Sequence, residues 1–125
     1  MSYDISIHVK AEGCEVYPVV CYPACSNPTY NLRNMFVACM DWDYEQYVEK
    51  ENGGWQPRYY RCDFVIDKIE HGIRELRTNR AAYEKYNPEN GWGDIDSAIR
   101  TLESIREAIY NEVQMIPINC LYMKW

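Results

Sequence analysis

Residues 94–113 read DIDSAIRTLESIREAIYNEV, and this stretch decides the class of fold. Its apolar side chains recur at the spacing of an α-helix, so they share one face: Ile95, Ala98, Ile99, Leu102, Ile105, Ile109 and Val113. Asp94 starts this helix with a residue type that caps helices, and Pro117 ends the run. The sequence therefore predicts one long amphipathic helix whose apolar face must pack on another layer.

Three further helical segments are predicted. Asp63 is a plausible cap for a helix that ends near Thr78-Asn79, with its apolar side chains again on one face, and residues 80–86 form a further short helical stretch. Residues 32–40 repeat the pattern as a short helix, which Thr29 or Asn31 could cap. The turn at residues 87–93 then joins the two long helices into a helix-turn-helix hairpin.

The remaining segments have the alternation of β-strands. Residues 3–11 place apolar side chains on one side, and residues 14–22 form the partner strand across a turn at Glu12-Gly13. A second, tyrosine-rich hairpin is predicted from residues 44–50 and 55–61, around Asn52-Gly53-Gly54. Residues 116–122 form a last strand. The 125 residues thus predict a single α+β domain, residues 1–125, with a small antiparallel β-sheet (N-terminal hairpin plus C-terminal strand) packed against the helical hairpin.

Charge and hydropathy exclude several classes of protein. The chain has 13 Lys and Arg against 19 Asp and Glu, a net charge of −6, and no local basic cluster, which argues against binding of polymeric nucleic acid. No apolar run approaches the roughly 20 residues of a membrane span. The first ten residues lack the basic segment followed by an apolar segment that is typical of a secretion signal. We therefore expect a cytoplasmic protein, with no membrane and no polymeric nucleic acid as partner.

The six cysteines are expected to be free and mostly buried thiols, since no secretion signal favours disulfides: Cys14, Cys21, Cys25, Cys39, Cys62 and Cys120. Cys21 and Cys25 have the spacing of half a zinc site, but no second pair follows, and His8 and His71 are the only histidines. We expect no metal, although the sequence leaves open whether this pair holds one.

No motif of a catalytic site occurs in the chain. A nucleophile elbow, a zinc-protease helix and a phosphate-binding loop with lysine are all absent. Asp41 with Asp43, and Asp94 with Asp96, lack the further ligands of a magnesium or calcium site. We therefore expect a protein that is not an enzyme and that needs no cofactor.

Arg106 lies within the apolar face of the long predicted helix. Such a residue needs a partner, which could be an internal carboxylate, or the side chain could extend over the core to reach water. The functional alternative is a guanidinium that presents its planar fork to a phosphate or carboxylate of a ligand. Arg58 is a second candidate for this role.

The turn from Asn87 to Asp94 contains a proline, two glycines and a tryptophan directly before a helix. Free backbone N–H groups at a helix start bind anions, so Asn90 and the backbone of Gly91, Trp92 and Gly93 are candidate ligand contacts. The alternative is a rigid turn in which Trp92 fills a gap in the core. The capping carboxylate of Asp94 argues against an anion, because it would occupy the same N–H groups.

Aromatic composition is biased, with 12 Tyr and 4 Trp against 2 Phe. Tyrosine combines a ring that can stack with a hydroxyl that needs a partner, which suits an interface or a base-binding pocket as well as the rim of an ordinary core. The candidates for stacking on a ligand are Tyr59, Tyr60, Tyr83, Tyr86 and Trp92.

Two short motifs carry a family resemblance. At Asn27-Pro28-Thr29-Tyr30-Asn31-Leu32 and again at Asn87-Pro88-Glu89-Asn90-Gly91-Trp92-Gly93, the chain resembles small, largely uncharacterised accessory proteins encoded by phages and prophages of gut bacteria. The opening Tyr3-Asp4-Ile5 is similar as well. The order of sheet followed by helix-turn-helix looks, more loosely, like the anti-Thoeris sponges of phages, oligomers that trap a cyclic ADP-ribose signal. This resemblance implies a phage protein acting in the cytoplasm of its bacterial host.

Two hypotheses follow from the sequence. In the first, the protein is a homo-oligomer that sequesters a small nucleotide-type immune signal, a cyclic ADP-ribose isomer or a cyclic oligonucleotide, without turnover, in pockets between protomers. Arg58 and Arg106 would neutralise its phosphates, Asn90 and the Gly91 to Gly93 backbone would donate hydrogen bonds, and Tyr83 or Trp92 would stack on the base. In the alternative, it is an anti-CRISPR-like inhibitor that covers a host protein with aromatic and acidic side chains.

Overall fold

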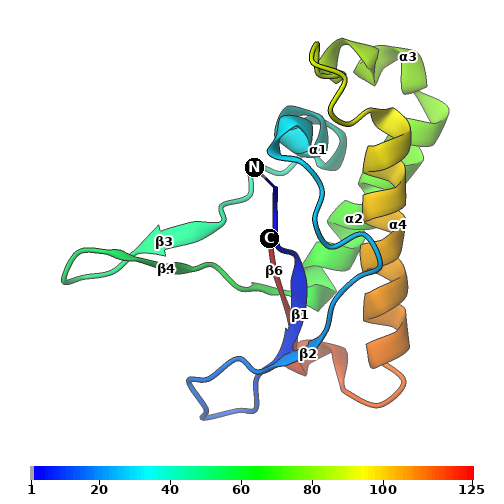
Figure 1. Ribbon diagram of the computed structural model, residues 1–125. Coiled ribbons are helices and arrows are strands. Elements are labelled where there is room, and N and C mark those ends of the chain that lie inside the picture. Colours follow the sequence, from blue (N-terminus) through cyan, green and yellow to red (C-terminus); the bar gives the residue numbers. More distant parts are fainter. Residues whose placement is uncertain (1) are drawn as a thin grey trace.

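The computed structural model describes residues 2–125 and confirms the predicted pair of long helices. Helix α4 (Ile95–Glu112) lies alongside α2 (Cys62–Thr78), and both cover one face of a small sheet (Figure 1). Asp94 caps α4 as predicted, since its Oδ1 accepts a hydrogen bond from the backbone N–H of Ser97 at 2.8 Å. The apolar face of α4 is buried against α2 and the sheet.

Helix α2 begins differently from the prediction. Arg61 occupies the capping position without a side-chain capping bond, and the Asp63 carboxylate pairs instead with the Arg61 guanidinium at 2.5 Å. Asp63 therefore lies in the first helical turn, where a negative charge still favours the helix dipole. The predicted helical stretch at residues 80–86 is present as α3 (Arg80–Tyr83) and the 3₁₀ turn η2 (Glu84–Tyr86).

Helix α1 (Arg33–Met40) crosses α2 at close range. A Cβ atom at Gly72 of α2 would lie 2.8 Å from Cγ of Met40, so only a glycine allows this approach. The 3₁₀ turn η1 (Tyr30–Leu32) leads into α1, and the hydroxyl of Thr29 caps it by accepting from the backbone N–H of Asn31. One of the two predicted caps is thus confirmed.

The main sheet has four antiparallel strands in the order β2-β1-β6-β5. They are β1 (Ser6–Val9), β2 (Val19–Cys21), β5 (Tyr60–Arg61) and β6 (Leu121–Lys124). The last strand lies later than the predicted residues 116–122, because residues 118–120 form a 3₁₀ turn, η3 (Ile118–Cys120). The predicted strand over residues 14–22 is wrong in its first half, where the chain forms a loop instead.

One side chain of that loop, Tyr17, packs over the sheet face opposite the helices. Tyr17 packs its ring on Tyr59 at 4.1 Å with the planes parallel, and edge-on against Tyr122 of β6 at 5.1 Å. Residues 10–18 are therefore held by aromatic contacts rather than by strand pairing. Pro18 lacks the backbone N–H that strand pairing needs, which explains why β2 begins only at Val19.

The predicted second hairpin is confirmed in a shorter form. Strands β3 (Tyr47–Glu49) and β4 (Trp55–Pro57) make a separate two-stranded sheet that projects away from the helices (Figure 1). The chain after β4 leaves this hairpin, and residues 60 and 61 join the main sheet as β5.

A cluster of aromatic side chains fills the core between the sheet and α1. The indole of Trp125 stacks on the ring of Tyr44 at 4.2 Å with 12° between the planes, and the hydroxyls of Tyr44 and Tyr3 are hydrogen-bonded at 2.9 Å. All three side chains are at most 1% exposed. Part of the tyrosine excess therefore belongs to the core.

All six cysteines are free, as predicted, but most are not buried. Cys39 and Cys62 are fully buried, which raises the pKa of each thiol to about 12. Cys14 is exposed and the other three are half-buried. The prediction of mostly buried thiols is wrong because the loop and edge strand that carry Cys14, Cys21 and Cys25 lie at the rim of the fold.

His8 of β1 is a buried, uncharged histidine. Its Nδ1 lies 2.7 Å from the Tyr17 carbonyl oxygen and donates to it, so Nε2 accepts from the Ser6 hydroxyl at 2.7 Å. Burial lowers the pKa of His8 below its ordinary value of 6.5, although the bond to Tyr17 opposes this shift. The imidazole thus ties the loop over residues 10–18 to the sheet in its neutral form.

We expect this histidine to make the protein less stable in mild acid. Because the unfolded chain takes up a proton near pH 6.5 and the folded chain only at lower pH, the contribution of His8 is complete above pH 6.5 and is lost as pH falls through the folded-state pKa. Urea unfolding of wild type and His8→Asn at pH 7.5 and pH 5.0 measures this. An equal decrease in both proteins would contradict the assignment.

Among residues 2–125, no helix is both long enough and apolar enough to cross a bilayer.

Candidate functional site

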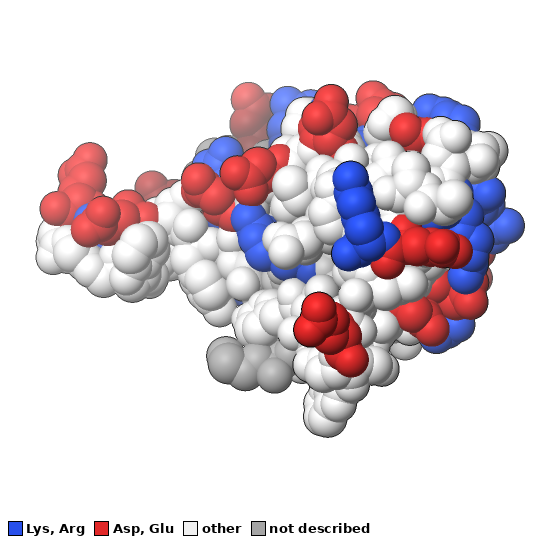
Figure 2. All heavy atoms as spheres, turned by 90° about the horizontal axis from the view of Figure 1, so that it is seen from above, with Lys and Arg blue, Asp and Glu red and all other residues white. Residues whose placement is uncertain are grey.

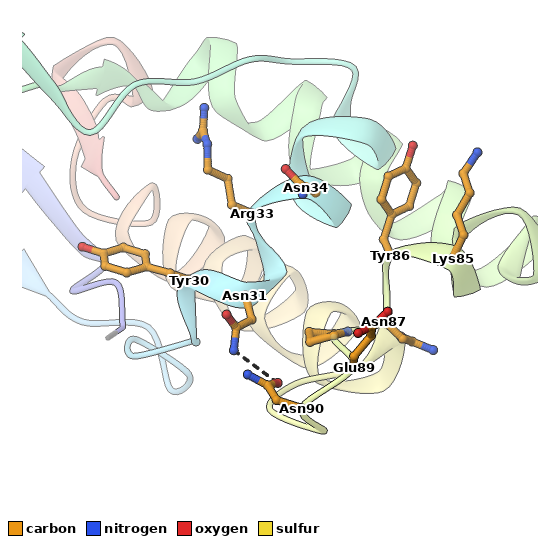
Figure 3. Close-up of a pocket in the computed structure, with 10 residues that line it drawn as sticks. Tyr30, Asn31, Arg33, Asn34, Lys85, Tyr86, Asn87, Glu89 and Asn90 are labelled. Carbon is orange, nitrogen blue, oxygen red and sulfur yellow. Dashed lines mark hydrogen bonds between the residues drawn. The ribbon is translucent and has the colours of Figure 1, made fainter.

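A surface groove lies where the start of α1 meets the segment that follows η2. It has a volume of about 650 Å³, and we call it the polar groove. Amide, charged and tyrosine side chains supply most of its walls (Figure 3): Tyr30, Asn31, Arg33, Asn34, Lys85, Tyr86, Asn87, Pro88, Glu89 and Asn90. Four of these ten residues are asparagines, so the groove offers both donors and acceptors of hydrogen bonds.

The two short motifs at residues 27–32 and 87–93 both contribute to this groove and meet beside it. The Asn31 side-chain amide donates to Oδ1 of Asn90 at 3.4 Å, a contact between residues 59 apart in the chain (Figure 3). The same Oδ1 accepts from the backbone N–H of Trp92 at 2.9 Å. Beside this contact, the Cα of Gly93 lies so close to Leu32 that a Cβ would meet its Cγ at 3.0 Å. The loop over residues 87–93 is thus fixed against η1.

Two cations and one carboxylate set the electrostatics of the groove. Figure 3 shows Arg33 and Lys85 toward opposite ends, with Asn34 and Tyr86 between them. Arg33 is oriented by two bonds, from Nη2 to Oδ1 of Asp43 at 2.8 Å and from Nη1 to the Tyr44 carbonyl at 3.1 Å. Lys85 lies over the ring of Tyr86 at 5.3 Å and has no carboxylate within 4.0 Å among residues 2–125. The groove can therefore receive an anionic group at either end.

The structure places the predicted loop residues at or near this groove, with different roles. Asn90 lines it, and Gly91 has a φ of 74°, which glycine adopts freely. Trp92 is 67% exposed, so the alternative that it fills a gap in the core is wrong. Gly93 serves the contact with Leu32 rather than a ligand.

The tyrosines proposed for stacking on a ligand lie in different parts of the structure. Tyr86 lines the polar groove, whereas the hydroxyl of Tyr83 donates to Glu75 of α2 at 3.3 Å. Tyr59 stacks on Tyr17 over the sheet, and Tyr60 packs edge-on against Trp42 at 4.8 Å.

Arg58 lies at a different groove, of about 460 Å³, between the loop over the sheet and the β3–β4 hairpin. Lys10, Tyr17, Gln56 and Tyr59 are among its walls. The Arg58 guanidinium lies 4.9 Å from the centre of the Tyr60 ring. The structure therefore does not bring Arg58 to the loop over residues 87–93.

Arg106 is half-buried on α4 and lines neither groove. It has no carboxylate within 4.0 Å among residues 2–125, so the internal ion pair considered from the sequence is not formed. At 1.5 Å per residue, the 12 residues from Asp94 place it about 18 Å along the helix from the loop. Within one protomer, the structure therefore does not bring Arg106 to the loop over residues 87–93.

Charges on the surface are mixed. On the face that Figure 2 shows, Lys and Arg side chains are interspersed with Asp and Glu, and acidic side chains gather on the part that projects to the left. Figure 1 identifies this projection as the β3–β4 hairpin. A continuous basic track for nucleic acid is not seen on that face.

The described residues hold no cluster of three or more His, Cys, Asp and Glu side chains suited to a metal ion. Burial, together with the nearby Glu112 carboxylate, raises the pKa of Cys21 to about 11. This thiol is therefore protonated near neutral pH.

Comparisons with family models, with curated proteins and with solved structures found no match for this chain. The residues themselves must therefore supply the argument for a function.

Proposed function

We propose that the protein binds a small nucleotide-type molecule in the polar groove and holds it without turnover. The observation that supports this proposal is the meeting of two asparagine-rich segments, 59 residues apart at Asn31 and Asn90, around a groove with a cation toward each end. Its volume of about 650 Å³ lies within the range of roughly 300–1,000 Å³ for small-molecule sites.

The lining suits the parts of a nucleotide. Side-chain amides such as those of Asn34 and Asn87 can donate hydrogen bonds to its ribose and phosphate oxygens. The guanidinium of Arg33 and the ammonium of Lys85 can neutralise phosphate, while the Glu89 carboxylate can accept bonds from ribose hydroxyls. The Tyr86 hydroxyl can bond to the same ligand oxygens.

Sequestration rather than catalysis is favoured by the same lining. The ten residues include no His, Cys, Ser or Thr, so the lining cannot form the common Ser–His or Cys–His pair of nucleophile and base. Together with the phage resemblance, this supports a protein that traps an immune signal, a cyclic ADP-ribose isomer or a cyclic oligonucleotide, in the host cytoplasm.

Calorimetry with cyclic ADP-ribose isomers, cyclic dinucleotides and nucleoside monophosphates tests the proposal. We expect micromolar or tighter binding of at least one of them, recovered unchanged by chromatography, and a loss of about tenfold or more in Asn90→Ala and Lys85→Ala. Arg74→Ala is the control, because Arg74 is exposed on α2 and lines neither groove. Absence of heat with every compound at millimolar concentration would refute the proposal.

A protein partner is the second candidate, and the free edge of the main sheet favours it. Strand β2 is terminal in the sheet and begins at Val19, which is 45% exposed; Val16 before the strand and Tyr22 directly after it are 69% and 64% exposed. No charged residue occurs from Val16 to Leu32, so the edge lacks the lysines that usually prevent pairing with another chain. A host protein or a second copy could add a strand here.

Two measurements separate the candidates. A boiled, protein-free filtrate that saturates the protein supports the small ligand, whereas a stoichiometric protein co-purified from host lysate supports the partner. Val19→Lys should abolish the protein contact or self-association seen by light scattering and leave nucleotide binding intact.

A further inference from the structure

A second groove adjoins the polar groove and is mostly apolar. Arg33, Tyr44, Glu45, Gln46, Tyr47 and Trp55 line it, with a volume of about 500 Å³, and we call it the aromatic groove. Arg33 belongs to both grooves. The Gln46 side-chain amide also donates to the Tyr30 hydroxyl of the polar groove at 3.3 Å. The two grooves are therefore parts of one continuous surface that passes Arg33.

The register of the β3–β4 hairpin places two rings on the same side. Tyr47 lies opposite Pro57, and Glu49 lies opposite Trp55. Since directly opposed residues and every second residue share a face of a sheet, Tyr47 and Trp55 are diagonal neighbours on one face. Trp55 is 67% exposed and Tyr47 is 47% exposed. Their rings are thus available to a ligand in the aromatic groove.

Arg33 is held rigidly at the junction of the two grooves. The Trp125 indole stacks on one face of the Tyr44 ring at 4.2 Å, so the Arg33 guanidinium, 4.8 Å from the ring centre, occupies the other face. Bonds to Asp43 and to the Tyr44 carbonyl use two of its five N–H groups. The side chain is 41% exposed, which leaves donors for a ligand.

We infer that the aromatic groove is the nucleobase subsite of the ligand that we propose for the polar groove. The base stacks on Trp55 and Tyr47, and Arg33 binds the phosphate or ribose oxygens that connect the two grooves. This inference rests on the proposed function. It adds Trp55, Tyr47 and Arg33 to the binding residues and assigns the hairpin a role in binding.

Stacking on a side-chain ring contributes enough to be measured by substitution to alanine, roughly a tenfold to hundredfold change in affinity for each base. The contribution depends on the base and not on the phosphate. Substitution of the hairpin rings should therefore leave the affinity for a ligand without a base unchanged. Substitution of Arg33 should lower the affinity for both kinds of ligand.

The experiment compares adenosine 5′-monophosphate and cyclic ADP-ribose with ribose 5-phosphate, by calorimetry on the full chain. We expect Trp55→Ala and Tyr47→Ala each to weaken the adenine compounds about tenfold or more and to change ribose 5-phosphate less than twofold. Trp55→Phe should retain most of the affinity but lose the quenching of tryptophan fluorescence by the adenine compounds. Tyr110→Ala is the control, because its ring is 45% exposed on α4, outside both grooves.

Each other outcome has a distinct meaning. If Asn90→Ala abolishes adenine binding but the hairpin variants do not change it, the subsite is refuted and the proposed function remains. If ribose 5-phosphate weakens as much as the adenine compounds in the hairpin variants, the hairpin only shapes the polar groove and the subsite is also refuted. If none of the three compounds nor any other tested nucleotide binds, both proposals fail. Circular dichroism of each variant establishes that the fold is retained.

Discussion

Trp125→Ala is expected to lower the free energy of unfolding by about 3–5 kcal/mol, the range for removing a buried tryptophan. The indole is fully buried and contacts four other rings, stacked on Tyr44 and at 5.6–6.2 Å from Phe36, Tyr3 and Trp42. Its removal leaves a cavity that the rigid sheet and α1 cannot close. Urea denaturation monitored by circular dichroism measures the loss.

Two further variants identify the cause of that loss. Trp92→Ala removes the same side chain from a position that is 67% exposed, so it should change stability by less than about 0.5 kcal/mol. Trp125→Phe should cost less than Trp125→Ala, because it keeps most of the apolar contact and removes an indole N–H that is buried without an acceptor. A loss below about 1 kcal/mol for Trp125→Ala would contradict the central position of this residue.

The long helices could be predicted because their signal is local. Ile95, Leu102 and Ile109 recur at the helical period within a single segment, and the cap at Asp94 adjoins them. The hairpin around Gly53 and Gly54 was predictable for the same reason, since both glycines have the positive φ that such a turn requires.

The aromatic core could not be predicted in the same way. Tyr3, Tyr44 and Trp125 come from three distant segments, and residues 41–46 have neither the period of a helix nor that of a strand. Only the tertiary fold decides which of 12 tyrosines are buried. Composition indicated that rings were important but could not separate Tyr44, in the core, from Tyr47, on the exposed hairpin.

The candidate site also contains some residues that the sequence predicts and others that it does not. Asn90 was found because glycine and proline mark its loop, and Asn31 lies in a motif that the sequence also singled out. Arg33, Asn34 and Lys85 were missed, since nothing in the sequence says which helix start the loop will face. The helical period predicts the position of Arg106 around the axis of α4, but the loop lies about 18 Å away along that axis within one protomer.

Of the two glycines in the loop that lines the polar groove, Gly93 is expected to contribute more to stability than Gly91. Gly93→Ala is expected to lower the free energy of unfolding by about 2–5 kcal/mol, since two costs add. A side chain at its φ of 95° is strained by about 1–2 kcal/mol, and the new Cβ, 2.9 Å from Thr29 Cγ2 and 3.0 Å from Leu32, overpacks the contact with η1 by about 1–3 kcal/mol.

Gly91→Ala separates the two costs, because Gly91 also has a positive φ, of 74°, but no atom lies within 4 Å of the added Cβ. It should lose only about 1–2 kcal/mol. Equal losses in the two variants, measured by urea unfolding, would show that the loop is not held by contact with η1. If the contact with Leu32 also positions Asn90, then Gly93→Ala must weaken nucleotide binding in the folded protein, and Gly91→Ala must weaken it less. The ratio of the nucleotide affinities of the two variants therefore reports whether the contact with Leu32 holds the loop in the position that binds the ligand.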